Sequence, residues 1–199
     1  MYNIAISIYS FFLHLISPFH KKVKLMVEGH TNTYKILESE IDTTSKYVWF
    51  HVASLGEYEQ ALPMIEIIKK EKPNYKVLLT FFSPSGYEVQ KDNNLVDVVC
   101  YLPFDRKKNV KRFLDLAQPD IAIFVKYEFW YNFIHELYMR EIPVYLISAV
   151  FRPNQLFFKP WGNVFKKILH YYTQLFVQDN KSEQLLKEQG FTNVIVMGD

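Results

Sequence analysis

The stretch that decides the fold is KYVWFHVASLGEYEQALPMIEIIKKEKPNYKVLLTF, residues 46–81. A short run of β-branched and aromatic residues stands at each end of it. The segment between the two runs places Leu62, Ile65 and Ile68 on one helical face. This order of strand, helix and strand is typical of a βαβ unit in a parallel sheet.

The same alternation continues along the rest of the chain. Most of the predicted strands are continuous apolar runs, which is expected when helices cover both faces of a sheet. The sequence therefore predicts an α/β fold over residues 46–199, with a Rossmann-like parallel sheet and helices on both faces. The predicted strands are Tyr47–Ala53, Lys76–Phe81, Val96–Leu102, Ile121–Lys126, Val144–Ala149, Leu175–Gln178 and Val194–Met197, and the predicted helices are Tyr58–Glu71, Lys108–Ala117, Phe129–Arg140, Trp161–Tyr171 and Lys181–Gln189.

Composition limits the classes of partner and site. The 23 basic and 21 acidic residues leave a formal net charge of +2, so no global field attracts nucleic acid, and we predict no nucleic-acid partner. The single cysteine, Cys100, excludes a disulfide framework and a cysteine-based zinc site. The chain has no glycine-rich dinucleotide motif, no P-loop and no clustered histidines, so we predict no cofactor and no metal.

Residues 1–45 form a separate N-terminal part. Ile4–Ile16 is apolar almost all round and helical, but it is shorter than the about 20 residues of a membrane-spanning helix. A basic cluster follows it, made of His20, Lys21, Lys22 and Lys24. Together they predict a helix in the membrane interface, facing anionic headgroups; a core helix packed on this domain or on another one is the alternative. Val27–Ser45 is polar and weakly patterned, and we expect it to be a linker.

Polar residues follow the predicted strands where each strand ends. Ligands of an open parallel sheet bind at the carboxyl ends of its strands, so these residues are expected to share one rim. Each residue type also caps helices, so only their convergence predicts a binding site. The candidates are Ser54, Gly56 and Glu57 after the first strand, Ser83, Ser85 and Gly86 after the second, Glu128 after the fourth and Arg152 after the fifth.

Glu57 is the candidate catalytic base. A reaction in which a hydroxyl attacks needs a carboxylate that takes the proton from that hydroxyl, in a tight loop that the substrate can reach. Gly56 would provide the close backbone approach, and the dipole of the helix that begins near Tyr58 favours the charged carboxylate. The alternative is that Glu57 is a first-turn acid that only stabilises its helix.

The other candidates also have two interpretations. Ser83 and Ser85, with Gly86 behind them, could hold an anion at a helix start or could simply cap that helix. Glu128 lies among aromatic residues, as carboxylates in sugar sites do, and a buried carboxylate requires a partner. His51, in the middle of a strand, is expected to be a hydrogen-bonded core residue and not a metal ligand.

Four elements resemble, in order and spacing, the N-terminal domain of 3-deoxy-D-manno-octulosonic acid (Kdo) transferases. The most specific has the pattern H-x-x-S-x-G-E. The elements are Trp49–Glu57, Thr80–Gly86, Tyr101–Asp105, and Glu128-Phe129-Trp130 followed by Asn132.

The resemblance implies the N-terminal half of a GT-B glycosyltransferase of lipopolysaccharide biosynthesis. Such enzymes move Kdo from CMP-Kdo to a lipid A precursor at the cytoplasmic face of the bacterial inner membrane, on which the N-terminal helix docks. The glutamate aligned with Glu57 is the family's general base, and the one aligned with Glu128 belongs to the acceptor side. The C-terminal nucleotide-sugar domain is expected to lie outside these 199 residues, which alone should not turn over.

Departures from the family pattern concern the acceptor side, and two alternatives to Kdo transfer are also open. Lys126, Tyr127 and Tyr131 stand where an acid, a threonine and a proline are common, and Arg152 is the nearest arginine after the fifth strand. One alternative is a GT-B transferase of another nucleotide sugar. The other is a non-catalytic, flavodoxin-like binding module tethered to the membrane, which would be indifferent to Glu57 and Glu128.

Overall fold

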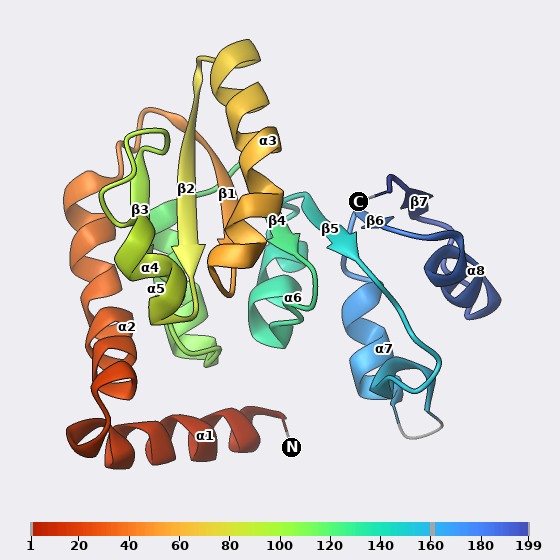
Figure 1. Cartoon of the computed structure of the whole chain (residues 1–199), viewed down its shortest axis with the longest axis horizontal. Helices are drawn as coiled ribbons and strands as arrows, with labels where there is room; N and C mark the ends of the chain where they lie inside the picture. Colours follow the sequence, from red (N-terminus) through yellow and green to blue (C-terminus); the bar gives the residue numbers. More distant parts are fainter. Residues whose placement is uncertain (1, 160–161, 199) are drawn as a thin grey trace.

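A seven-stranded parallel sheet forms the centre of the molecule (Figure 1). The computed structural model describes residues 2–159 and 162–198. The strand order is β3-β2-β1-β4-β5-β6-β7, and it confirms the predicted Rossmann-like fold. The strands are β1 Lys46–Val52, β2 Tyr75–Phe81, β3 Val98–Tyr101, β4 Ile121–Val125, β5 Val144–Ala149, β6 Gln174–Val177 and β7 Val194–Val196.

Helices cover both faces of this sheet because successive strand residues point to opposite sides. Trp49 belongs to the core cluster that α2, α5, α6, α7 and α8 share on one face, whereas its neighbour Phe50 belongs to the cluster with α3 on the other face. The helices after β1 are α3 Leu55–Glu71, α4 Pro84–Gln90, α5 Lys107–Ala117, α6 Tyr131–Met139, η2 Leu156–Phe158, α7 Asn163–Leu169 and α8 Asn180–Glu188. The predicted helix Trp161–Tyr171 thus corresponds to α7, and Trp161 lies outside the described residues.

The expectation of a linker at Val27–Ser45 is wrong for most of that segment. Helix α2 runs from Lys21 to Glu40 and packs along β3 and α5. It buries Met26, His30, Thr33 and Leu37, and the Thr33 hydroxyl donates a hydrogen bond of 2.7 Å to the Tyr101 carbonyl. Two of these four inward residues are polar, so the sequence lacks the regular spacing of apolar residues by which a helix is identified.

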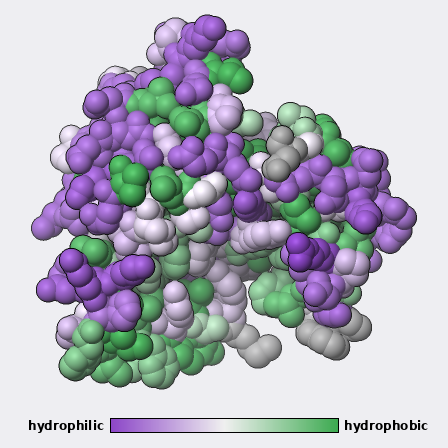
Figure 2. All heavy atoms as spheres, in the orientation of Figure 1, coloured by the Kyte–Doolittle hydropathy of each residue, from purple (hydrophilic) through white to green (hydrophobic). Residues whose placement is uncertain are grey.

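Helix α1, Tyr2–Ile16, continues into the short helix η1, Ser17–Phe19, and lies across the end of α2 (Figure 1). One side of the helix contacts the domain: Ser10 is buried, and the Tyr9 ring packs edge-on against Phe104. Its apolar side faces outward, and hydrophobic residues gather there at the bottom of Figure 2. The exposed residues are Ile4, Ile8, Phe11, Phe12, Leu15 and Ile16, each between 45 and 64% accessible. Among the described residues, α1 is therefore not a core helix.

The window Tyr2–Phe19 is, by length and composition, the one helical stretch of the described chain that could cross a membrane, and 6% of it is buried. Length alone does not distinguish a spanning helix from an interfacial one.

Candidate functional site

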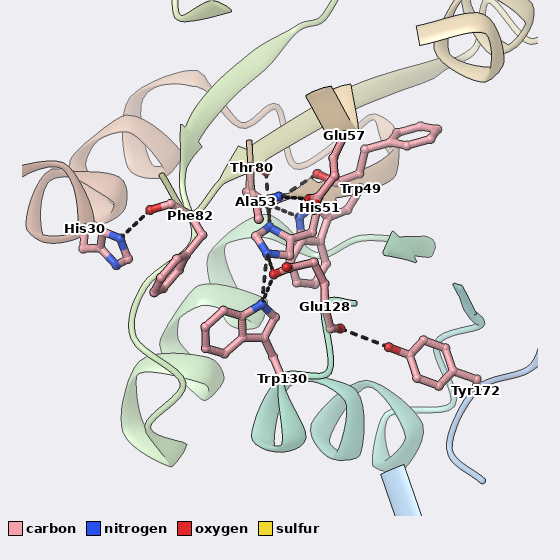
Figure 3. A network of polar contacts seen from close by, with 11 residues as sticks. His30, Trp49, His51, Ala53, Glu57, Thr80, Phe82, Glu128, Trp130 and Tyr172 are labelled. Carbon is pink, nitrogen blue, oxygen red and sulfur yellow. Dashed lines mark hydrogen bonds and ion pairs between the residues drawn. The ribbon is translucent and has the colours of Figure 1, made fainter. Parts of the chain in front are cut away.

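The candidate site lies at the carboxyl ends of β1 and β4. These strands are hydrogen-bonded neighbours in the sheet, although β2, β3 and their helices separate them in sequence. The order of strands reverses between them, and the crevice at such a switch point is where open α/β sheets bind ligands. Glu57 follows β1 and Glu128 follows β4, so the sheet brings both glutamates to this edge, as predicted (Figure 3).

Glu57 is a half-buried residue in the first turn of α3. The helix begins at Leu55, three residues earlier than predicted, so Glu57 is part of the helix and not of a preceding loop. Its Oε2 accepts a hydrogen bond from the Ala53 N–H, which fastens the carboxylate to the end of β1. Glu57 thus makes the contact expected of a first-turn acid that stabilises its helix, since it satisfies a backbone amide before the helix.

The pKa of Glu57 is raised above the ordinary value, and burial is the main cause. The Ala53 N–H opposes this shift, and the negative charge of Glu128 adds to it. His51 and Lys126 have smaller effects that lower the pKa. A carboxylate whose pKa is raised in this way is a stronger base than a solvent-exposed glutamate.

Glu128 is held in a nearly buried position by both its side chain and its backbone. Its Oε2 accepts a hydrogen bond of 2.6 Å from the Trp130 indole N–H and lies 3.0 Å from Nε2 of His51. The Tyr172 hydroxyl donates to its backbone carbonyl at 3.2 Å. Lys126, just after β4, takes a left-handed backbone conformation with φ of 61°, which turns the chain toward this edge.

His51 is the residue of this site that the sequence did not assign to it. The prediction of a hydrogen-bonded core histidine is confirmed, because the ring is fully buried and lies 2.9 Å from the Thr80 hydroxyl. The same ring also contacts Glu128, which supplies the partner that a buried carboxylate requires. The parallel pairing of His51 with Thr80 between β1 and β2 places them side by side.

No described contact requires a serine at position 54 or a glycine at position 56. Ser54 is the N-cap of α3, yet its side chain makes no capping bond among the described contacts. A Cβ at Gly56 would meet no described atom within 4 Å, so packing does not require glycine there. Gly56 is exposed beside Glu57, and both residues therefore stay predictions as acceptor contacts.

Capping and packing account for the β2–α4 loop. Ser83 is the N-cap of α4 and accepts a hydrogen bond from the Ser85 N–H, as the capping interpretation predicts. A Cβ at Gly86 would lie 2.3 Å from the Phe81 ring, so glycine is needed for the close approach of α4 to β2. An acceptor-binding role for Ser83, Ser85 and Gly86 stays a prediction.

Arg152 stands apart from the two glutamates in the described contacts. It is exposed in the loop after β5, where its N–H donates to the Gln155 side chain and it lines a groove with Asp179 and Lys181. Within the described residues, no three histidine, cysteine or acidic side chains are grouped as a metal site requires. The arrangement is thus a pair of carboxylates around a neutral or cationic imidazole, which suits proton transfer and sugar binding.

A comparison with protein families shows the family of this chain. Residues 28–199 match the family model of 3-deoxy-D-manno-octulosonic-acid transferases (Kdo transferases). The chain belongs to the Kdo transferase family. The match covers the whole sheet and includes both Glu57 and Glu128.

Curated Kdo transferases are similar to long parts of the chain. The enzyme from Haemophilus influenzae is 33% identical over 103 residues, which cover 51% of this chain and 24% of that protein. The one from Rickettsia felis is 28% identical over 176 residues, covering 86% of this chain and 37% of that protein. This chain therefore spans well under half the length of these curated relatives.

Solved structures show the same fold at low sequence identity. A UDP-GlcNAc 2-epimerase from Neisseria meningitidis bound to UDP-GlcNAc gives a TM-score of 0.56 with 16% identity, over 77% of this chain and 46% of that one. The corresponding enzyme from Methanocaldococcus jannaschii gives 0.56 with 14% identity, over 77% and 45%. These likenesses support the Rossmann-like half of a GT-B architecture.

Proposed function

We propose that this chain is the acceptor-binding domain of an inverting glycosyltransferase that moves Kdo from CMP-Kdo to a lipid A precursor. Membership of the Kdo transferase family supports the reaction class. The observation that carries the assignment of the site is the meeting of Glu57 and Glu128 at the switch point of the sheet. In this proposal a further C-terminal domain binds the nucleotide sugar.

Glu57 acts as the general base of this reaction. It takes the proton from a sugar hydroxyl of the acceptor, the hydroxyl oxygen bonds to the anomeric carbon of Kdo, and CMP departs with the electrons of the broken bond. Its raised pKa favours proton transfer near neutral pH. Since the Ala53 N–H occupies Oε2, the other oxygen, Oε1, receives the proton.

The remaining rim residues bind the acceptor in this proposal. Glu128 accepts a hydrogen bond from a sugar hydroxyl beside Glu57. Ser54, Gly56 and the β2–α4 loop with Ser83, Ser85 and Gly86 border the sugar, while Arg152 meets an acceptor phosphate farther along the edge. Arginine suits a phosphate because its guanidinium donates two parallel hydrogen bonds.

The test of the base role is a Glu57→Gln variant of the full-length enzyme, supplied with CMP-Kdo and a lipid A precursor. Glutamine keeps the size and the acceptor for the Ala53 N–H but cannot take a proton, so kcat should fall about 100-fold or more with little change in unfolding. The matched control is Glu59→Gln, an exposed residue two positions along the same helix. Wild-type-like turnover by a folded Glu57→Gln variant would contradict the base role.

The donor is tested in the same assay. We expect product with CMP-Kdo and none with UDP-linked or GDP-linked hexoses. Transfer from another nucleotide sugar would support the alternative of a different GT-B transferase, and no transfer from any donor would support a binding module.

We also propose that the protein acts at the cytoplasmic face of the bacterial inner membrane, with α1 lying in the interface. The exposed apolar side of α1 is the support, together with the basic residues beside it. The basic residues that would face anionic headgroups are His20, Lys21, Lys22 and Lys24, which follow α1 and are exposed.

Vesicle sedimentation tests the membrane proposal. A Phe11→Glu, Phe12→Glu double variant changes two residues that are 64 and 52% exposed, so the fold should survive while binding to vesicles of phosphatidylglycerol and phosphatidylethanolamine is lost. Ile67→Glu, on α3 and 54% exposed, is the control and should bind as the wild type does. Equal binding by all three proteins would contradict an interfacial role for α1.

A further inference from the structure

A chain of buried polar groups runs behind Glu128, away from the open edge (Figure 3). The Trp49 indole N–H donates to the Thr80 hydroxyl oxygen at 2.8 Å. That oxygen lies 2.9 Å from Nδ1 of His51, whose Nε2 lies 3.0 Å from Oε2 of Glu128. Trp49, Thr80 and His51 are all fully buried, so water cannot replace any of these contacts.

The distances assign the hydrogen atoms of this chain. Thr80 has one hydroxyl proton, and it can go to Nδ1 of His51 at 2.9 Å or to the Phe50 carbonyl at 3.3 Å. Nδ1 is the shorter choice, and this contact is also closer than the 3.2 Å between Nδ1 and the Thr80 carbonyl. A neutral imidazole that accepts at Nδ1 carries its proton on Nε2, the nitrogen that faces Glu128.

The other neutral tautomer of His51 fits less well. With the proton on Nδ1, the lone pair of Nε2 would face the carboxylate oxygen 3.0 Å away. The Trp130 N–H would not relieve this repulsion, since it lies 3.1 Å from Nε2 but 2.6 Å from the charged Oε2.

We propose that Thr80 and Trp49 are positioning residues that fix His51 as the Nε2–H tautomer, so that His51 and Trp130 together hold Oε2 of Glu128. Both side-chain bonds described for this carboxylate fall on Oε2. Oε1 is then the atom that accepts a hydroxyl of the acceptor sugar, in one fixed orientation beside Glu57. This role for Glu128 rests on the proposed function, whereas the tautomer of His51 does not.

The experiment pairs Thr80→Val with Thr80→Ser in the full-length enzyme. Valine has the shape of threonine without the hydroxyl, and serine keeps the hydroxyl. Long-range ¹⁵N–¹H NMR of histidine-labelled protein reports which ring nitrogen of His51 carries the proton, with the His51 signal identified by its loss in a His51→Asn variant. We expect a neutral Nε2–H ring in the wild type and in Thr80→Ser, and a different protonation state in Thr80→Val.

Kinetics test the positioning role. Thr80→Val weakens the orientation of a hydrogen bond to a charged group, so kcat/KM for the lipid acceptor should fall roughly 10- to 100-fold. The KM for CMP-Kdo should stay unchanged. Thr80→Ser should restore the wild-type value. If Thr80→Val does not fold, Thr80→Ala removes the same hydroxyl without placing a methyl group against the Trp49 N–H.

Each result decides one step. A wild-type His51 with its proton on Nδ1 alone, or on both nitrogens, overturns the tautomer assignment whatever the activity. A changed tautomer with an unchanged acceptor kcat/KM overturns the positioning role. Absence of Kdo transfer by the wild-type enzyme refutes the proposed function, and the NMR result then still decides the tautomer.

Discussion

Replacing Asp105 with asparagine should change how the stability of the fold depends on pH. Asp105 is a fully buried carboxylate in the loop between β3 and α5. It accepts hydrogen bonds from the Tyr2 hydroxyl of α1 at 2.6 Å and from the backbone N–H groups of Asn132 and Phe133 at 3.0 Å each. Because α6 begins just after Glu128 and Trp130, Asp105 joins the proposed membrane helix to the loop that holds the candidate site.

Two effects on the pKa of Asp105 oppose each other. Burial disfavours the charged carboxylate and raises the pKa to about 6 from 3.8, although the three donors act to lower it. A folded-state pKa above the unfolded value means that the folded protein binds the proton more tightly. The stability from this group is therefore fully present below about pH 3.8 and is lost as the pH rises through about 6, a change of about 3 kcal/mol.

The assay is urea unfolding of the wild type and Asp105→Asn at a series of pH values from about 4 to 7.5. The free energy of unfolding of the wild type minus that of the variant should fall by about 2.5 kcal/mol across this range, because asparagine does not titrate. Asp92→Asn, an exposed residue, is the control and should give a flat difference. If the difference in unfolding free energy between wild type and Asp105→Asn stays flat or grows with pH, the three hydrogen bonds offset or outweigh the effect of burial on the pKa of Asp105.

Three further predictions concern the site and the core. Glu128→Gln removes a negative charge that raises the pKa of Glu57, so the acidic limb of the kcat/KM profile should move to lower pH. An unmoved limb would mean that the charge of Glu128 does not affect the pKa of Glu57. Gly56→Ala should leave the free energy of unfolding unchanged or raise it by about 1 kcal/mol, since a Cβ meets open space in a helix, and should weaken acceptor binding if the sugar approaches there, as measured by the acceptor KM. Leu37→Ala, at a residue 1% exposed on α2, should cost about 2–5 kcal/mol in urea unfolding, whereas a loss under about 0.5 kcal/mol would mean that α2 is not part of the core.

The sheet could be predicted because its signal is local. In runs such as Val77–Phe81 every residue but Thr80 is apolar, and a strand buried on both faces is the element that requires this over so short a length. The shared edge of Glu57 and Glu128 followed from the same reasoning, because parallel strands place all their carboxyl ends together.

The contacts of His51 could not be predicted in the same way. The partners Thr80 and Glu128 are 29 and 77 residues away in sequence, and they become neighbours only through the strand order and the register of β1 with β2. The sequence shows a histidine within an apolar strand, which is equally typical of a core residue. Only the side chains around it reveal that it supports a carboxylate at the site.

The orientation of α1 is a second feature that the sequence left open. A segment that is apolar almost all round does not reveal which side faces the protein. Tyr2 and Asn3 make the decisive contacts, with Asp105 and Asn132, and these hydrogen bonds turn the polar side inward. The result is the reverse of an ordinary surface helix, whose apolar side packs on the core.

The capping and base roles of Glu57 are compatible in the structure. The bond from the Ala53 N–H uses one carboxylate oxygen and holds the side chain toward the edge of the sheet, which is the fixed orientation that a base requires. A glutamine at this position keeps an oxygen for that bond and loses only the capacity to take a proton. Stability and turnover of Glu57→Gln therefore measure the two roles separately: retained stability with lost turnover assigns the proton transfer to Glu57, and retained turnover leaves it the cap of α3 alone.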